Sequence, residues 1–127
     1  MRWKALAPLF FLALILPVST TLFAAEHVVL RVVVVKTDSP DAYVKELEKG
    51  KALLKKLGSP AVIRVWRARF AGQDAGSVVA SVEYPSMAAF VKDEAAIDAS
   101  PEYQTWIKGL DKIRKIVSDS IYDELKP

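Results

Sequence analysis

The sequence predicts an α+β fold in which one four-stranded antiparallel sheet carries two helices on one face, in the split βαββαβ order. Three patterns predict it: a β-branched run before an amphipathic helical pattern, two alternating segments around a glycine-rich turn, and a second helical stretch before a short last strand. Strands are expected at residues 27–36, 61–70, 77–84 and 117–122, and the first helix is expected at residues 40–57. Together they make one domain of modest size.

The first 25 residues have the pattern of an export signal. Arg2 and Lys4 form a positive start, a long apolar run follows, and small residues end the segment at Ala25. We therefore expect a signal peptide at 1–25, export to the periplasm or beyond, and a mature domain at 26–127. Because the apolar run is uncharged and long enough to span a bilayer, an uncleaved N-terminal membrane anchor is the alternative.

The composition excludes several classes of site. The chain has no cysteine, so it has no disulfide, thiolate metal site or cysteine nucleophile. Its one histidine, His27, lies beside the expected cleavage point, so we expect no histidine metal site, no Ser/His/Asp triad and no cofactor. Beyond the signal, 16 basic residues face 15 acidic ones, and this balance predicts no nucleic-acid partner.

The run at 27–36 predicts a central strand that is buried on both faces, because six of its ten residues are valine. Arg31 is the one charge inside it. A buried guanidinium is costly unless it is paired, so Arg31 is expected either to bind a carboxylate or to face a water-filled cavity.

The first helix is expected to begin at Ser39, as N-cap, with Pro40 in its first turn, and to end before Gly58. Its predicted apolar stripe contains Val44, Leu47, Leu54 and Leu57, and lysines occupy much of the remaining surface. This basic run is interpreted as a solvated face of the helix.

The segment 76–98 joins the third strand to the second helical stretch. Pro85 ends the strand and Ser86 is the expected N-cap of the next helix. Ser100 and Pro101 restart the helix, and the apolar stripe that follows is interpreted as core: Tyr103, Trp106, Ile107, Leu110 and Ile113.

Two helices cover only one face of a four-stranded sheet. The other face is expected to hold Val29, Val33, Val35, Val62, Trp66, Phe70 and Val79. Exposure of such an apolar face to water is unfavourable. We therefore expect a homodimer in which Trp66 and Phe70 are buried between the subunits.

The phrases VEYPSMAAF, SPEYQTW and VSDSIYDEL give the chain a resemblance to the dimeric α/β barrel superfamily of ferredoxin-like proteins, over residues 26–125. The resemblance implies two sheets packed face to face around a small apolar or aromatic ligand. The superfamily includes quinone-forming and haem-degrading monooxygenases and stress-responsive proteins. The haem-degrading members use a histidine well inside the fold, whereas His27 opens the first strand. An Asn–Trp–His oxygenase set is absent, since the chain has no asparagine.

One polar cluster is the predicted ligand-binding site. A regular hairpin sets Arg64 opposite Glu83 and Trp66 opposite Ser81, and Arg31 on the neighbouring strand approaches the same carboxylate. Two interpretations remain open. In one, the cluster is a buried ion pair that fixes strand register; in the other, a spare guanidinium donor holds an anionic aromatic ligand while Trp66 packs on its ring.

The sequence therefore favours a small exported homodimer that binds a small apolar or aromatic molecule between its sheets, or that serves as a structural module. No catalytic residue is assigned. One alternative is a cofactor-independent monooxygenase-like enzyme that acts on a small aromatic or quinone-like compound. Another is a membrane-tethered interaction domain.

Overall fold

A computed structural model describes residues 26–127, and the predicted signal peptide lies outside the described residues. The elements, in chain order, are β1 (Val29–Lys36), α1 (Pro40–Lys56), β2 (Val62–Arg67), the short 3-10 turn η1 (Gly72–Asp74), β3 (Val78–Tyr84), α2 (Met87–Asp98), α3 (Pro101–Leu110) and β4 (Lys115–Asp123). The predicted second helical stretch is thus two helices, separated at Ser100.

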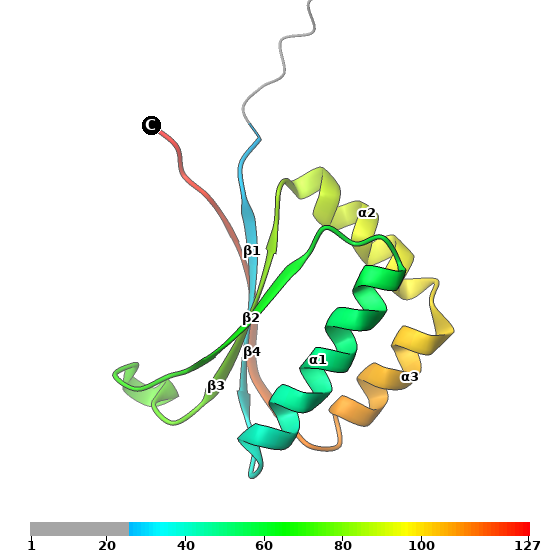
Figure 1. Cartoon of the computed structure of the whole chain (residues 1–127). Helices are drawn as coiled ribbons and strands as arrows, with labels where there is room; N and C mark the ends of the chain where they lie inside the picture. Colours follow the sequence, from blue (N-terminus) through cyan, green and yellow to red (C-terminus); the bar gives the residue numbers. More distant parts are fainter. Residues whose placement is uncertain (1–25) are drawn as a thin grey trace, which may run out of the picture.

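The four strands form one antiparallel sheet in the order β2-β3-β1-β4, which confirms the predicted fold class. All three helices lie against the same face of this sheet, and the other face is left without a covering layer (Figure 1). β1 and β3 are the inner strands, as the sequence predicted. No helix in the described part of the chain is long and apolar enough to cross a membrane.

Serine caps fix the starts of the helices in the second half. The Ser86 hydroxyl accepts a hydrogen bond from the Ala89 N–H at 3.1 Å, and the Ser100 hydroxyl accepts one from the Tyr103 N–H at 3.2 Å. Ser39 occupies the N-cap position of α1, but its side chain accepts no hydrogen bond from the first turn. At the other end of α1, Gly58 has a φ of +74°, a left-handed conformation that glycine adopts without strain.

The core lies between the sheet and the helices. Its buried members are Val33, Val35, Tyr43, Leu47, Val78, Ala80 and Leu110, and Trp106, Ile107 and Ile113 pack against them. The predicted stripe of α3 is therefore confirmed. The predicted stripe of α1 is half wrong, because Val44 and Leu57 are exposed while Tyr43 and Gly50 are buried.

The assignment of β1 side chains to the two faces was wrong. Val33 pairs with Ala80 and Val35 with Val78, so these valines, and Val29 with them, face the helices. A β-branched strand that is apolar on both faces carries no signal for which face the helices cover. The uncovered face holds the opposite set of side chains, among them the exposed Val62, Trp66 and Tyr122.

The hairpin register also differs from the prediction. Arg64 pairs with Ser81 and Trp66 with Val79, so Glu83 is not directly opposite Arg64. The turn η1 lies in the connection and moves the centre of the hairpin by one residue from the predicted position. Each residue of β2 therefore pairs with a β3 residue two positions away from the predicted one. Because the side-chain period of a strand is two, side chains predicted to share a face of the hairpin still do so. Phe70 lies beyond the end of β2 and is fully exposed.

The close approach of α1 to α3 depends on Gly50. A Cβ atom at Gly50 would overlap the ring of Trp106, whose indole N–H donates to the Glu46 carbonyl at 3.1 Å.

We expect Gly50→Ala to lower the free energy of unfolding by about 1–3 kcal/mol, as overpacking does. Gly109→Ala is the matched control, because a Cβ there meets nothing within 4 Å. In α3 the added methyl is expected to be neutral or to stabilise by up to about 1 kcal/mol.

Urea denaturation of the purified variants measures both changes. Equal stability of the two variants would contradict the packing role of Gly50.

Candidate functional site

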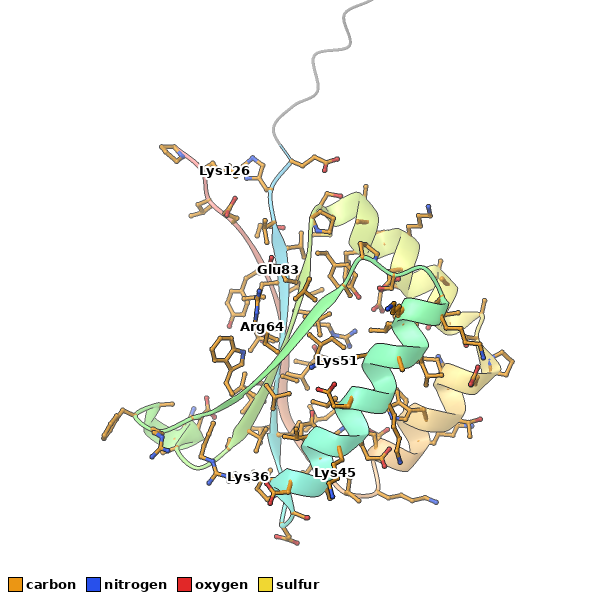
Figure 2. All side chains as sticks on the ribbon, in the orientation of Figure 1. Lys36, Lys45, Lys51, Arg64, Glu83 and Lys126 are labelled. Atoms are coloured by element: carbon orange, nitrogen blue, oxygen red, sulfur yellow. The ribbon has the colours of Figure 1, made fainter. Side chains whose placement is uncertain are left out.

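Four of the five predicted site residues lie together on the uncovered face of the sheet. The Trp66 indole N–H donates to the Ser81 hydroxyl at 2.8 Å, and an Arg64 N–H donates to a Glu83 carboxylate oxygen at 3.3 Å. Figure 2 shows Arg64 and Glu83 on the side of the sheet away from the helices. The predicted neighbours are therefore in contact, as diagonal rather than directly opposite pairs. About half of the Arg64 side chain is exposed, so this ion pair is an open surface pair in the protomer.

Arg31 does not join them, and its predicted place beside Glu83 is wrong. Its side chain lies between the sheet and the helices, where Nε and Nη2 donate to the two carboxylate oxygens of Asp119 at 2.9 and 2.7 Å. A third N–H donates to Glu94 of α2 at 3.1 Å. Of the two alternatives expected for Arg31, a carboxylate partner or a water-filled cavity, the structure shows the carboxylate partner, but with Asp119 and Glu94 on the other face in place of Glu83.

Arg31 borders a small cavity between the sheet and the helix layer. The cavity volume is about 110 Å³. Its apolar walls come from β1, β2, β3, α1, α3 and β4, and include Val33, Leu47, Ile63, Ala80, Val82, Ile107, Leu110 and Ile116. Its polar and aromatic lining consists of Arg31, Tyr43, Tyr103, Trp106, Arg114 and Asp119. An apolar box with a few convergent polar groups is the usual form of a small-molecule site.

Tyr43 is the most informative side chain of this lining. It is 0% exposed, and its hydroxyl makes no hydrogen bond of good geometry among the described residues, although the Arg114 guanidinium lies near it. Burial raises the pKa of this hydroxyl, and the neighbouring Arg114 guanidinium, as a hydrogen-bonding group and as a charge, offsets part of that effect. A buried polar group without a partner is rare in proteins, and it indicates an ordered water or a bound molecule at that point.

The tyrosine hydroxyls and the guanidinium groups that line the cavity are donors at neutral pH. Burial raises the pKa of Tyr103 to about 12, so Tyr103, like Tyr43, keeps its proton. The hydrogen bonds from Arg31 lower the pKa of Asp119, so this carboxylate is ionised and already occupied. Among the lining residues no carboxylate or imidazole is therefore placed to remove a proton from a ligand. The lining can hold an oxygen atom of a ligand through hydroxyl and guanidinium donors.

Sequence reasoning missed the contributions of Tyr43, Arg114 and Asp119. Tyr43 lies one position before the predicted stripe of α1, and Arg114 lies in the connection before β4. One available signal was the alternation in β4, which places Asp119 and Ile121 on one face. Asp119 pairs with Val33 and Ile121 with Arg31, so both face the helices. Over residues 26–127, no group of three histidine, aspartate or glutamate side chains could hold a metal ion.

Comparison of the chain with protein-family models finds no match, and comparison with curated protein sequences finds none either. Solved structures are similar. A NIPSNAP family protein from Agrobacterium tumefaciens has a TM-score of 0.62 and 13% identity, with 83% of this chain and 90% of that chain covered. SnoaB, a cofactor-independent oxygenase from Streptomyces nogalater, has a TM-score of 0.52 and 15% identity, with 82% and 97% covered. A putative antibiotic biosynthesis monooxygenase from Nitrosomonas europaea has a TM-score of 0.52 and 19% identity, with 83% and 96% covered.

The element order, the sheet topology and these neighbours define the class: the chain has the ferredoxin-like fold of the dimeric α/β barrel proteins. Within that class its structural neighbours are NIPSNAP and antibiotic biosynthesis monooxygenase structures. At identities of 13–19% the likeness is one of fold.

The Arg31–Asp119 pair predicts a pH dependence of stability. Because the pKa of Asp119 is lower in the folded than in the unfolded protein, the pair stabilises the fold above about pH 4, and this contribution is lost as pH falls through the folded-state pKa. Asp119 is 35% exposed, so solvent screening limits the contribution to about 1 kcal/mol.

We therefore expect Asp119→Asn to lower the free energy of unfolding by about 1 kcal/mol at pH 7 and to make stability fall less steeply below pH 4. Glu48→Gln is the control, because its pair with Lys51 is an exposed i,i+3 contact on α1. Urea denaturation from pH 2 to 7 measures both variants. Parallel pH profiles for Asp119→Asn and the unsubstituted protein would contradict the assignment.

Proposed function

We propose that the protein is an exported homodimer that binds a compact aromatic molecule carrying a hydroxyl or phenolate oxygen. The ligand lies in the cavity between the sheet and the helices, on the other side of the sheet from the place predicted from the sequence. The observation that carries this proposal is the buried Tyr43 hydroxyl, which lines an apolar cavity and lacks a partner among the described residues.

The size of the cavity sets the class of ligand. Apolar cavities of about 150 Å³ in other proteins admit benzene. A cavity of about 110 Å³ suits a single ring after a small outward movement of its walls. Tyr103 and Trp106 supply aromatic surface to such a ring, while the Tyr43 hydroxyl and the Arg114 guanidinium are the donors for its oxygen.

A cofactor-independent monooxygenase-like activity is the second candidate. It is favoured by the likeness in fold to SnoaB, a cofactor-independent oxygenase. Donors that stabilise a phenolate raise the population of the anion, and a phenolate gives up electrons to oxygen more readily than the neutral phenol does. Since no base is placed in the lining, the substrate would have to arrive as the anion. Oxygen consumption with a quinone product would favour the enzyme, and saturable binding without turnover favours the binding module.

The homodimer is proposed from the uncovered sheet face. Trp66 is 54% exposed there, and the exposed Val62 and Tyr122 lie on the same face. The neighbouring folds are those of dimeric α/β barrels, in which two such faces meet. A second copy would cover the aromatic surface and would enclose the Arg64–Glu83 pair. This arrangement gives the predicted polar cluster a role in holding subunits together.

Ligand binding is tested with Tyr43→Phe, which removes only the hydroxyl. We expect phenol to bind more tightly than toluene, with saturable shifts of the Ile107, Leu110 and Ile116 methyl signals in NMR spectra. Tyr43→Phe should reduce the affinity for phenol about fivefold to tenfold and leave that for toluene unchanged, as loss of one hydrogen bond does. Tyr122→Phe is the control, because this hydroxyl lies outside the cavity, on the opposite face of the sheet.

The stability of the ligand-free protein gives a second test of the same residue. Because the Tyr43 hydroxyl lacks a partner, Tyr43→Phe should be neutral or should stabilise by up to about 1 kcal/mol. A clear destabilisation, or phenol shifts that do not saturate, would contradict the proposed site.

Dimerisation is tested with Trp66→Ala. Since the residue is half exposed in the protomer, its truncation should change protomer folding little but cost about 2–4 kcal/mol at an interface. We expect sedimentation velocity to show dimers of the unsubstituted protein and monomers of the variant at micromolar concentration. Val91→Ala, an exposed apolar residue of α2 on the helix side, should remain dimeric. A well-folded monomer of the unsubstituted protein would refute the homodimer.

A further inference from the structure

An open hollow lies at the end of the sheet where β1 leads into α1 and where α3 leads into β4. Its volume is about 500 Å³, within the range of about 300–1,000 Å³ that ligand sites occupy. Its lining consists of Lys36, Thr37, Asp38, Ser39, Lys112, Ile113, Arg114 and Lys115. Figure 2 shows Lys36 at the foot of the sheet, beside the start of α1.

Basic side chains dominate this hollow. Four of the eight lining residues are cationic, and Asp38 is the one acid among them. Arg114 is held by Asp111 just outside, at 2.8 Å. Within residues 26–127 the three lysines of the hollow form no ion pair within 4.0 Å, as is also the case for Lys45, Lys55, Lys92 and Lys108, so no carboxylate of the described chain neutralises them. The described chain is almost neutral overall, so this concentration of cations is local.

Two of the lysines are placed unfavourably toward one another. Lys36 and Lys115 are direct partners in the β1–β4 ladder, where opposing side chains lie close together. Like charges directly opposite in a sheet destabilise it, unless an anion lies between them. The start of α1 adds positive potential, because the Ser39 side chain caps none of its first N–H groups. The lysine pair is the main source of positive charge here, and the helix end adds a smaller part.

We propose that this hollow binds the phosphate group of a small molecule. A phosphate offers three oxygen atoms and up to two negative charges, which matches a hollow lined by lysines of β1, of β4 and of the segment before β4. A carboxylate has fewer acceptor sites for the same set of donors. The site is separate from the aromatic cavity, although Arg114 borders both, and its occupation does not depend on the function proposed for that cavity.

The test uses ¹⁵N-labelled protein and inorganic phosphate, at constant ionic strength balanced with chloride. We expect saturable amide shifts confined to residues 36–41 and 111–115, and tighter binding of phenyl phosphate than of benzoate. Lys36→Gln and Lys115→Gln should each weaken phosphate binding at least tenfold. Lys92→Gln, on the exposed surface of α2, makes the same charge change elsewhere and should leave the affinity unchanged.

Thermal unfolding provides a readout that does not depend on the NMR signals. Without phosphate, Lys36→Gln should raise the Tm by about 1–5 °C, because it removes the like-charge pair. Phosphate should raise the Tm of the unsubstituted protein and of Lys92→Gln, and not that of Lys36→Gln.

Three results would overturn the proposal. One is the absence of saturation with phosphate. Another is an equal loss of affinity in Lys92→Gln, which would indicate nonspecific attraction. The third is that the protein sediments with vesicles of anionic phospholipid through Lys36 and Lys115 but does not bind free phosphate saturably. That result would indicate that the hollow binds a membrane surface.

Discussion

The placement of Arg31 constrains much of the molecule. A guanidinium between a sheet and its helices requires carboxylates from the elements around it, and here Asp119 of β4 and Glu94 of α2 supply them. The pairing joins the edge strand β4 and the helix layer to the inner strand β1. The pair also makes one side of the cavity between the sheet and the helices polar. Tyrosine hydroxyls and guanidinium groups therefore line this cavity together with aliphatic side chains.

The parts of the fold that local chemistry specifies could be predicted from the sequence. Ser86 and Ser100 cap helices where a cap residue precedes an apolar stripe, and Gly58 ends α1 with a positive φ. The face assignment of β1 could not be predicted, because Val32 and Val33 are chemically alike and their order says nothing of where the helices pack. The hairpin register depended on η1, whose 3-10 turn no residue pattern specified.

The residues of the candidate site likewise fall into those that local sequence places together and those that only tertiary packing brings together. Arg64, Trp66, Ser81 and Glu83 lie within one hairpin, so alternation alone placed them on one face, and an error of two in register did not separate them. Tyr43 belongs to α1, whereas Arg114 and Asp119 lie just before and within β4, and the two segments meet only after the helices dock on the sheet. Their proximity is a property of helix packing, which depends on the contact of Gly50 with Trp106 and not on any spacing visible in the chain.

The two ends of the described chain run side by side. The Glu124 N–H donates to the Val28 carbonyl, and Lys126 donates to the Glu26 carbonyl. Both ends leave the domain at the top of the sheet, opposite the foot where Lys36 lies (Figures 1 and 2). A tether or fusion at either terminus would therefore hold the domain by the same end and present the lysine-rich foot outward, as the part farthest from whatever the domain is attached to.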